Sequence, residues 1–286
     1  MNIMKSKYYN IKYHLKTFLW NQSGLSPINY VQYKTGEWGD TISPTLIQYL
    51  SNAKPREIDI KEYKTLSYQS DRLDEFYLMV GSTLHHADKQ LIVWGSGFSQ
   101  AKLSFEQAPK LICAVRGPLS RDRVIALGIE CPDLWGDPLL LLPKFYSPKI
   151  ASDYRLGIIS HIADYSASTL KQLLKNEGVL LIDTSKLSVK EVADLVCRCD
   201  KVVSTSLHGL VLADAYQIAS GWIKNSKRSP EQDFKFYDYF SSLGLYDKIP
   251  LELSSDLSLP QLEEICRVRK ITINLDDLEN SCPFRR

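Results

Sequence analysis

The sequence lacks several features that would assign it to a special class of protein. It has no run of 18 consecutive apolar residues, which argues against a transmembrane helix. Its N-terminus has neither the apolar core nor the cleavage site of a signal peptide, so we expect a cytoplasmic protein, at most peripheral on the inner face of the membrane. The 35 basic and 33 acidic residues give a net charge of +2, which offers no indication of a nucleic-acid partner.

Cysteine is also sparse and lacks a diagnostic pattern. The six cysteines are scattered, and they have the spacing of neither a disulfide framework nor a zinc site. This favours reduced structural thiols, and we expect no metal.

The length and composition are those of a folded protein with two domains. A chain of 286 residues suffices for two domains of about 140 residues each. The 44% hydrophobic content can fill two cores, which excludes wholesale disorder. The segment from Pro143 to Pro148 is bracketed by prolines, and a similar pattern restarts after it. We therefore predict an N-terminal domain of residues 1–145 and a C-terminal domain of residues 146–286.

Short β-branched apolar runs alternate with amphipathic stretches along the chain. The runs are residues 28–33, 91–94, 111–115, 156–160, 179–182 and 201–204. Apolar residues fall at helical spacing in residues 45–50, 119–127, 169–176, 189–196 and 207–216. This alternation predicts an α/β fold with parallel sheets covered by helices. We expect two Rossmann-like domains that face each other across a cleft.

The first 20 residues have a different character. They carry a stripe of apolar side chains flanked by Lys5, Lys7, Lys12 and Lys16. A basic amphipathic segment of this kind can lie on an anionic membrane surface. A terminal helix packed on its own domain is the more common alternative, and both interpretations remain open.

Glycine or a functional polar side chain follows each apolar run. In open α/β sheets, ligands bind beyond the carboxyl ends of the strands, so these positions are the first candidates for a site. They are Gly36–Asp40, Gly95–Gly97, Arg116–Pro118, His161, Asp183 and Thr205–Gly209. Because they come from both halves of the chain, they predict a site in the cleft between the domains.

Two of these turns have the features of an anion-binding site. Arg116 lies just before Pro118, which suits the first position of a helix, so its guanidinium would be beside free helix amides. Ser206 can cap a helix that begins at Leu207, and His208 lies in its first turn. The alternatives are that Arg116 pairs with a carboxylate and that His208 is a hydrogen-bonded core residue.

Three other features each have a structural and a functional interpretation. Asp40 could cap a helix, but Ser43 and Pro44 offer a better helix start, which leaves Asp40 free for another role. The Gly95–Gly97 turn is of a frequent kind, and Asp137 could be an ordinary turn aspartate.

Seven short motifs, taken in order, resemble those of the polysaccharide pyruvyl transferase family. They are WGDT (38–41), VWGSGF (93–98), AVRGPLS (114–120), WGDP (135–138), STSLHGL (204–210), ADAY (213–216) and KFYDY (235–239). The resemblance implies a glycosyltransferase-B-like fold. It also implies transfer of the pyruvyl group of phosphoenolpyruvate to two hydroxyls of a sugar, with formation of a cyclic ketal. The expected acceptor is galactose or a related hexose of a bacterial exopolysaccharide or capsule, carried on a lipid-linked precursor. No cofactor is expected besides the donor substrate.

The resemblance also implies roles for single residues. Asp40 and Arg116 match an acidic residue and an arginine of the family's donor site. The family's Arg-Leu-His element reads Ser206-Leu207-His208 here, so one cation is missing, and Arg121, Arg123 or Lys235 could replace it. The catalytic candidates are Asp40 and His208. The expected donor-binding residues are Gly95, Ser96, Gly97, Arg116, Ser206, Leu207 and His208. The expected acceptor-binding or supporting residues are Asp137, His161 and Lys235.

Two other functions are compatible with the sequence. One is a nucleotide-sugar glycosyltransferase of the same fold, and the other is a non-catalytic glycan-binding protein. The presence of Asp40, Arg116 and His208 together argues against the non-catalytic alternative.

Overall fold

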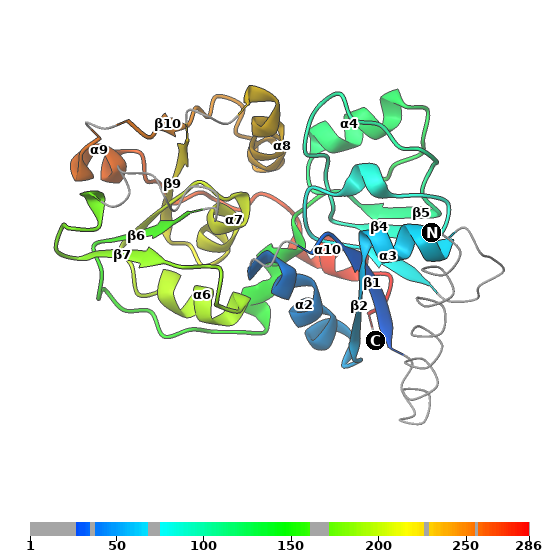
Figure 1. Ribbon diagram of the computed structural model, residues 1–286, viewed down its shortest axis with the longest axis horizontal. Helices are drawn as coiled ribbons and strands as arrows, with labels where there is room; N and C mark the ends of the chain where they lie inside the picture. Colours follow the sequence, from blue (N-terminus) through cyan, green and yellow to red (C-terminus); the bar gives the residue numbers. More distant parts are fainter. Residues whose placement is uncertain are drawn as a thin grey trace, which may run out of the picture.

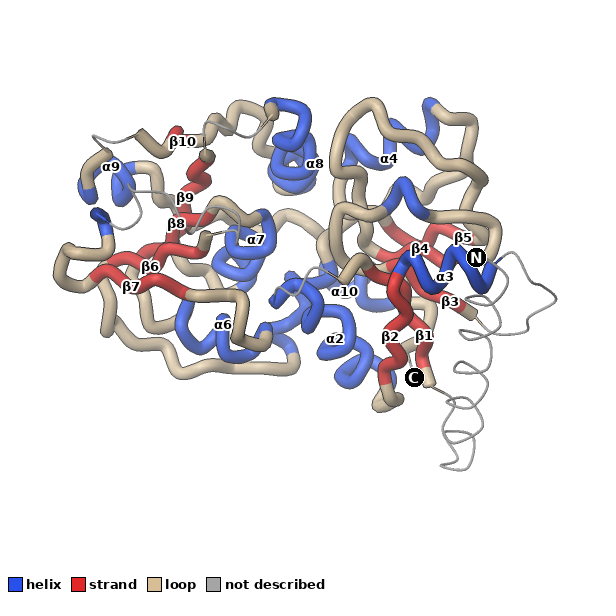
Figure 2. Tube along the Cα trace, in the orientation of Figure 1, coloured by secondary structure: helices blue, strands red, loops and turns tan. Residues whose placement is uncertain are grey.

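The computed structural model describes residues 27–34, 38–67, 75–160, 172–225, 229–254 and 257–285. Its strands form two separate sheets, each flanked by helices (Figures 1 and 2). The α/β class predicted from the alternating pattern is confirmed. The basic N-terminal segment of residues 1–20 and His161 lie outside the described residues, so the predictions for them stay predictions.

The first sheet is built from the first half of the chain. Its strands are β1 (Ile28–Gln32), β2 (Pro55–Asp59), β3 (Phe76–Leu78), β4 (Leu91–Trp94) and β5 (Leu111–Ala114). The strand order is β2-β1-β3-β4-β5, and all neighbours pair in parallel. Every residue of β1 is buried, as expected for a parallel strand covered on both faces.

The helices of the first half begin close to the predicted positions. They are η1 (Trp38–Thr41), α2 (Ile42–Ser51), α3 (Ile60–Ser67), η2 (Leu84–His86), α4 (Pro118–Ala126) and η3 (Pro138–Lys144). Pro118 opens α4, as its fixed φ angle predicts. The expected start of α2 at Ser43 and Pro44 is wrong, because the turn η1 leads directly into α2, with Thr41 at the N-cap.

The second sheet repeats the topology of the first. Its strands are β6 (Leu156–Ile159), β7 (Val179–Ile182), β8 (Lys201–Ser204), β9 (Ala219–Lys224) and β10 (Leu251–Glu252). The order β10-β9-β8-β6-β7 is again fully parallel. When the strands of each sheet are numbered in chain order, both sheets have the order 2-1-3-4-5. The second strand therefore lies on one side of the first strand, and the later strands lie on the other side. Ligands of such sheets bind at this switch point, between the first and third strands.

Helices of the second half cover its sheet and connect it to the first half. They are α6 (Val189–Val196), α7 (Leu207–Ala215), η5 (Pro230–Asp233), α8 (Phe234–Ser242), α9 (Leu259–Glu264) and α10 (Leu275–Asn280). Ser188 and Glu191 form a capping box at the start of α6. In the described part of the chain, no helix has both the length and the hydropathy needed to cross a membrane.

The C-terminal segment packs against the first half. The indole Nε1 of Trp94 on β4 donates a hydrogen bond to the carbonyl oxygen of Leu278 on α10, at 3.1 Å. Lys144 forms an ion pair with Glu279 at 2.8 Å, and the ring of Phe284 meets that of Tyr77 edge-on. Helix α10, from the second half of the chain, thus returns to the first sheet (Figure 1), and the domain boundary after residue 145 stays a prediction.

The two halves share one hydrophobic core. Its largest cluster combines Leu46 of α2 and Leu140 of η3 with Val192 of α6 and Leu210 of α7. Burial of apolar surface therefore stabilises the junction between the sheets as well as each half.

Candidate active site

The turn η1, which follows β1, is docked on the second half of the molecule. The side-chain oxygen of Thr41 accepts a hydrogen bond from the backbone N–H of Val189, the first residue of α6, at 2.8 Å. The ring of Trp38 meets that of His208 edge-on, with centroids 6.2 Å apart. Gly39 lies so close that a Cβ atom there would be 3.4 Å from Nδ1 of His208. The turn after β1 and the start of α7 therefore face each other.

Asp40 occupies the middle of this junction. It lies in η1 between Gly39, which adjoins His208, and Thr41, which contacts α6. Its backbone is therefore held where the two halves meet, although its side chain lies outside what the structure describes. The N-cap position of α2 belongs to Thr41, so Asp40 is not the cap of that helix.

His208 lies at the N-terminus of α7 and has an unused ring nitrogen. Its Nε2 atom is buried and has no hydrogen-bond partner among the described residues. Burial, followed by the positive charges of Lys235 and Arg116, lowers the pKa of His208 to about 3. The imidazole is thus neutral at physiological pH. Ser206 at the N-cap makes no side-chain capping bond, so it leaves the first amides of α7 to other partners.

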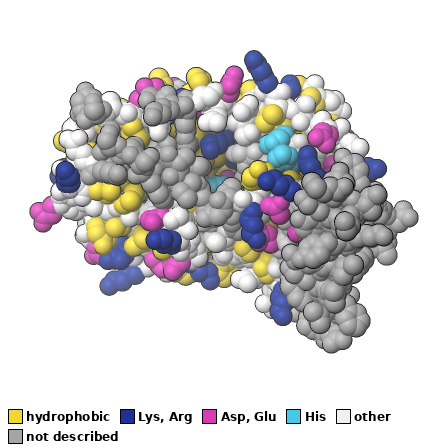
Figure 3. Space-filling model, in the orientation of Figure 1, with side chains coloured by type: hydrophobic (Ala, Val, Ile, Leu, Met, Phe, Trp, Pro, Cys, Tyr) yellow, Lys and Arg dark blue, Asp and Glu magenta, His cyan; other side chains and the backbone are white. Residues whose placement is uncertain are grey.

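Lys235 approaches the same place from α8. It is half-buried, and its ammonium lies 5.3 Å from the ring centroid of Phe236. Its effect on the pKa of His208 shows that the two side chains are close enough to interact. A space-filling view shows basic, acidic and histidine side chains in the hollow where the halves meet (Figure 3).

Arg116 is fully buried and held by protein groups on all sides. Its Nε and Nη2 atoms lie 2.9 and 2.8 Å from one carboxylate oxygen of Asp238 on α8. Its Nη1 donates to the hydroxyl of Ser82 at 2.8 Å, and Nη2 donates to the carbonyl of Phe98 at 2.7 Å. Each of the three guanidinium nitrogens thus contacts at least one protein oxygen. In this structure Arg116 does not face an open cavity.

The N-terminus of α4 is an anion site, and its anion belongs to the protein. One oxygen of Asp238 accepts from the backbone N–H of Ser120, and the other accepts from the hydroxyl of Ser120, both at 2.7 Å. The turn around Arg116 therefore has the predicted preference for negative charge, but a carboxylate from the other half satisfies it. Helices α4 and α8 lie side by side as a result (Figure 1).

Comparison with known proteins supports the family resemblance that the seven sequence motifs indicated. The family model for polysaccharide pyruvyl transferase matches residues 39–227, which is more than half of the chain. The chain belongs to the polysaccharide pyruvyl transferase family. The matched range includes residues 39–41 of η1, the Arg116 turn and the start of α7.

Two relatives show how far the similarity extends. The chain is 26% identical over 261 residues to an uncharacterized protein of Acanthamoeba polyphaga mimivirus, an alignment that covers 88% of this chain and 83% of that protein. It is 29% identical over 160 residues to the succinoglycan biosynthesis protein ExoV of Rhizobium meliloti (strain 1021). That alignment covers 54% of this chain and 48% of ExoV, so this chain matches about half the length of that relative.

The glycine turn after β4 packs against protein groups in this member of the family. Gly95 has a φ angle of 84°, and a Cβ there would be 2.2 Å from the ring of Pro138. A Cβ on Gly97 would be 2.5 Å from the guanidinium carbon of Arg116, and Ser96 is fully buried. We expected these residues to contact the donor. That expectation stays a prediction, and in the structure Pro138 and Arg116 fill the space beside the turn.

Two other predicted site residues, Leu207 and Asp137, are buried, one in the hydrophobic core and the other at the start of η3. Leu207 packs in the hydrophobic core, so its contribution is packing at the base of α7. Asp137 caps η3 by accepting from the N–H of Leu139 at 3.0 Å. Its second oxygen has no partner in the described part of the chain, and burial raises its pKa to about 6. Asp137 is therefore a carboxyl group that can hold or release a proton near neutral pH.

The structure adds one functional residue that we did not assign from the sequence. Asp238 lies within the KFYDY motif, but its pairing with Arg116 joins residues that are 122 positions apart. A search of the described residues finds no group of three or more histidine, cysteine, aspartate or glutamate side chains arranged to hold a metal ion.

Proposed function

We propose that the protein transfers the pyruvyl group of phosphoenolpyruvate to two hydroxyls of a sugar, forming a cyclic ketal. The observation that carries this proposal is the buried Nε2 of His208, which lacks a partner among the described residues at the N-terminus of α7. A helix N-terminus with free amides favours an anion, and phosphoenolpyruvate carries both a phosphate and a carboxylate. Family membership supports the reaction type.

In this proposal the donor binds between α7, α8 and η1. The first amides of α7 and the ring of His208 bind one anionic group, and Lys235 neutralises charge from α8. Arg116 acts indirectly, because its ion pair with Asp238 holds the helix that carries Lys235. Lys235 and Asp238 are three residues apart and therefore lie on the same side of α8. Lys235 is our choice for the cation that replaces the arginine of the family's Arg-Leu-His element.

The chemistry needs one group that accepts a proton and one that donates it. A proton added to the methylene carbon of phosphoenolpyruvate creates an electron-deficient C2, which a sugar hydroxyl attacks. Phosphate then leaves, the second hydroxyl attacks C2 to close the ring, and the proton of that hydroxyl goes to the departing phosphate. We assign Asp40 to accept the proton of the attacking hydroxyl. Binding of an anion beside His208 raises the pKa of that histidine, so it can take up a proton and deliver it.

Family membership alone specifies neither the arrangement of the domains nor the acceptor sugar, and we propose both. The two parallel sheets of identical strand order support two Rossmann-like domains in a glycosyltransferase-B-like arrangement. The relative ExoV is a succinoglycan biosynthesis protein. We therefore propose galactose or a related hexose of a bacterial surface glycan as acceptor, carried on a lipid-linked precursor at the cytoplasmic face of the membrane.

Phosphoenolpyruvate is expected to raise the melting temperature of the protein. Saturation at about 100 times the dissociation constant contributes roughly 2.7 kcal/mol to the free energy of unfolding. The measurement is a thermal shift with phosphoenolpyruvate, and with pyruvate and UDP-galactose as comparison ligands. His208→Asn should abolish the shift, whereas His86→Asn, in η2, should retain it.

The same titration separates the two enzymatic alternatives. Stabilisation by UDP-galactose without stabilisation by phosphoenolpyruvate would replace the pyruvyl transferase with a nucleotide-sugar glycosyltransferase. A ligand-independent melting temperature in a well-folded protein would favour the non-catalytic glycan-binding alternative.

A further inference from the structure

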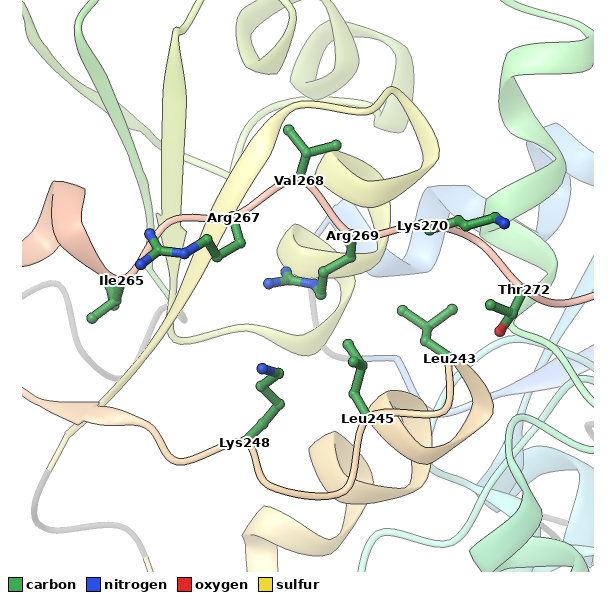
Figure 4. Close-up of a pocket in the computed structure, with 9 residues that line it drawn as sticks. All are labelled: Leu243, Leu245, Lys248, Ile265, Arg267, Val268, Arg269, Lys270 and Thr272. Atoms are coloured by element: carbon green, nitrogen blue, oxygen red, sulfur yellow. The ribbon is translucent and has the colours of Figure 1, made fainter.

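One cavity of the second half lies between the loop that follows α8 and residues 265–272, and its volume is about 460 Å³ (Figure 4). The charged ends of Arg267 and Lys270 point away from each other in Figure 4. Arg267 also donates hydrogen bonds to the carbonyl oxygens of Glu264 and Cys266. These two cations therefore do not form a joint binding site.

The polar contacts of the turn η1, in contrast, meet at one place. This turn follows β1 of the first half, but both of its ends are bonded to the second half. The backbone N–H of Trp38 donates to the carbonyl oxygen of Thr184, just after β7, at 3.1 Å. The hydroxyl of Thr41 accepts from the backbone N–H of Val189 at 2.8 Å. Asp40 lies between these two anchors.

The hydroxyl of Thr41 is used in an unusual way for its position. Thr41 is the N-cap residue of α2, where a threonine oxygen commonly accepts from an amide of its own helix, but it makes no such bond. It donates instead to the carbonyl oxygen of Trp38 at 2.6 Å and accepts from Val189 of α6. One hydroxyl thus closes the turn and joins it to the other half.

The amide of Val189 needs a partner from outside its own helix. Val189 is the first residue of α6, and the first amides of a helix have no intrahelical acceptor. The side chain of Ser188 caps the amide of Glu191, so Thr41 supplies the acceptor for Val189. Val189 is buried, and an unpaired amide at such a place is costly.

We infer that Thr41 is a positioning residue, which fixes the turn that carries Asp40 against the half that carries His208. The inference rests on the proposed function, because it places Asp40 and His208 in one reaction. The edge-on contact between the rings of Trp38 and His208 lies at the same junction. The proton acceptor and the donor-binding histidine come from different halves, and the hydroxyl of Thr41 holds their backbones in a fixed relation.

Thr41→Val keeps the branched shape of the side chain and removes both hydrogen bonds. We expect kcat to fall by about 10- to 100-fold, since a displacement of about 1 Å can cost that much. The thermal shift with phosphoenolpyruvate should remain, because His208 and the first amides of α7 belong to the second half. Thr41→Ser restores the hydroxyl and should recover most of kcat.

The matched control is Thr65→Val on α3. Thr65 is half-buried, as Thr41 is, and its hydroxyl donates to the carbonyl oxygen of Lys61 at 3.0 Å, within one helix. Its loss should leave kcat normal. Normal kcat in Thr41→Val, or an equal loss in Thr41→Ser, would overturn the positioning role.

Val189→Pro removes the same hydrogen bond from the other side. Proline suits the first position of a helix, and Ser188 before it has an extended backbone, with φ −78° and ψ 165°. This variant should also lower kcat, and combining it with Thr41→Val should lower kcat no further than Thr41→Val alone. Losses that simply multiply would show that the two residues act independently.

Hydrogen–deuterium exchange at the amide of Val189, followed by NMR, tests the anchor without turnover. The first amide of a helix ordinarily exchanges freely, whereas this one should be protected in the wild-type protein, in Thr41→Ser and in Thr65→Val. Protection should disappear in Thr41→Val. Free exchange in the wild-type protein would overturn the inference. A protected amide in a protein that forms no ketal would contradict the proposed function and leave the anchor established.

Discussion

Arg116→Ala is expected to lower the free energy of unfolding by about 3–5 kcal/mol, the cost of leaving one partner of a buried ion pair without its counter-charge. The Asp238 carboxylate is fully buried, and among the described residues only Ser120 would continue to donate a hydrogen bond to it. The loss should appear in urea denaturation as a lower midpoint. Donor affinity should fall as well, because α8 carries Lys235 and is no longer held against α4.

The control is an ion pair of the same type on the surface. Arg198 pairs with Asp153 at 2.7 Å, but both side chains are exposed, so Arg198→Ala should cost less than about 1 kcal/mol. Adding Asp238→Ala to Arg116→Ala should cost much less than the sum of the single changes, since it removes the stranded charge. If Arg116→Ala abolished donor binding at unchanged stability, Arg116 would be a direct ligand contact and the interface assignment would be wrong.

Asp40→Asn is expected to lower turnover by roughly two to four decades, the usual contribution of a positioned acid or base. Asparagine preserves size and hydrogen bonding but cannot accept the proton of the sugar hydroxyl. The melting temperature should change little, because Thr41 and not Asp40 occupies the N-cap position of α2. Phosphate release from phosphoenolpyruvate in the presence of acceptor measures the effect.

Asp122→Asn serves as the matched control, because Asp122 is an exposed aspartate on α4. It should have normal turnover. Near-normal turnover in Asp40→Asn would remove Asp40 from the mechanism and leave His208 and Asp137 as the candidates for proton transfer.

The sequence predicted the fold class and the strands with strong apolar runs, but it missed four strands. The strand β2 begins with proline and alternates buried and half-exposed residues, so it has no continuous apolar run. Strands β3 and β10 contain three and two residues, which are too few for a periodic pattern. The strand β9 includes Ser220, Gly221 and Lys224, which lower its apolar content. Tertiary pairing, not local pattern, fixes these strands.

The sequence predicted the local features of the candidate site but not the contacts between residues that are far apart in the chain. The rule that polar residues follow strand ends identified Arg116 and His208, and the structure places both near the junction of the halves. Local pattern also indicated an anion site at the start of α4. It gave no way to identify Asp238 as the anion, because that contact depends on how two separately formed sheets pack together.

The most direct test of the central claim is mass spectrometry of a sugar acceptor incubated with the protein and phosphoenolpyruvate. We expect the acceptor to gain the mass of pyruvate less one water, as formation of a ketal requires. One phosphate should be released for each acceptor modified. An acceptor of unchanged mass in the presence of bound phosphoenolpyruvate, or a gain of one sugar unit from a nucleotide sugar, would contradict the account.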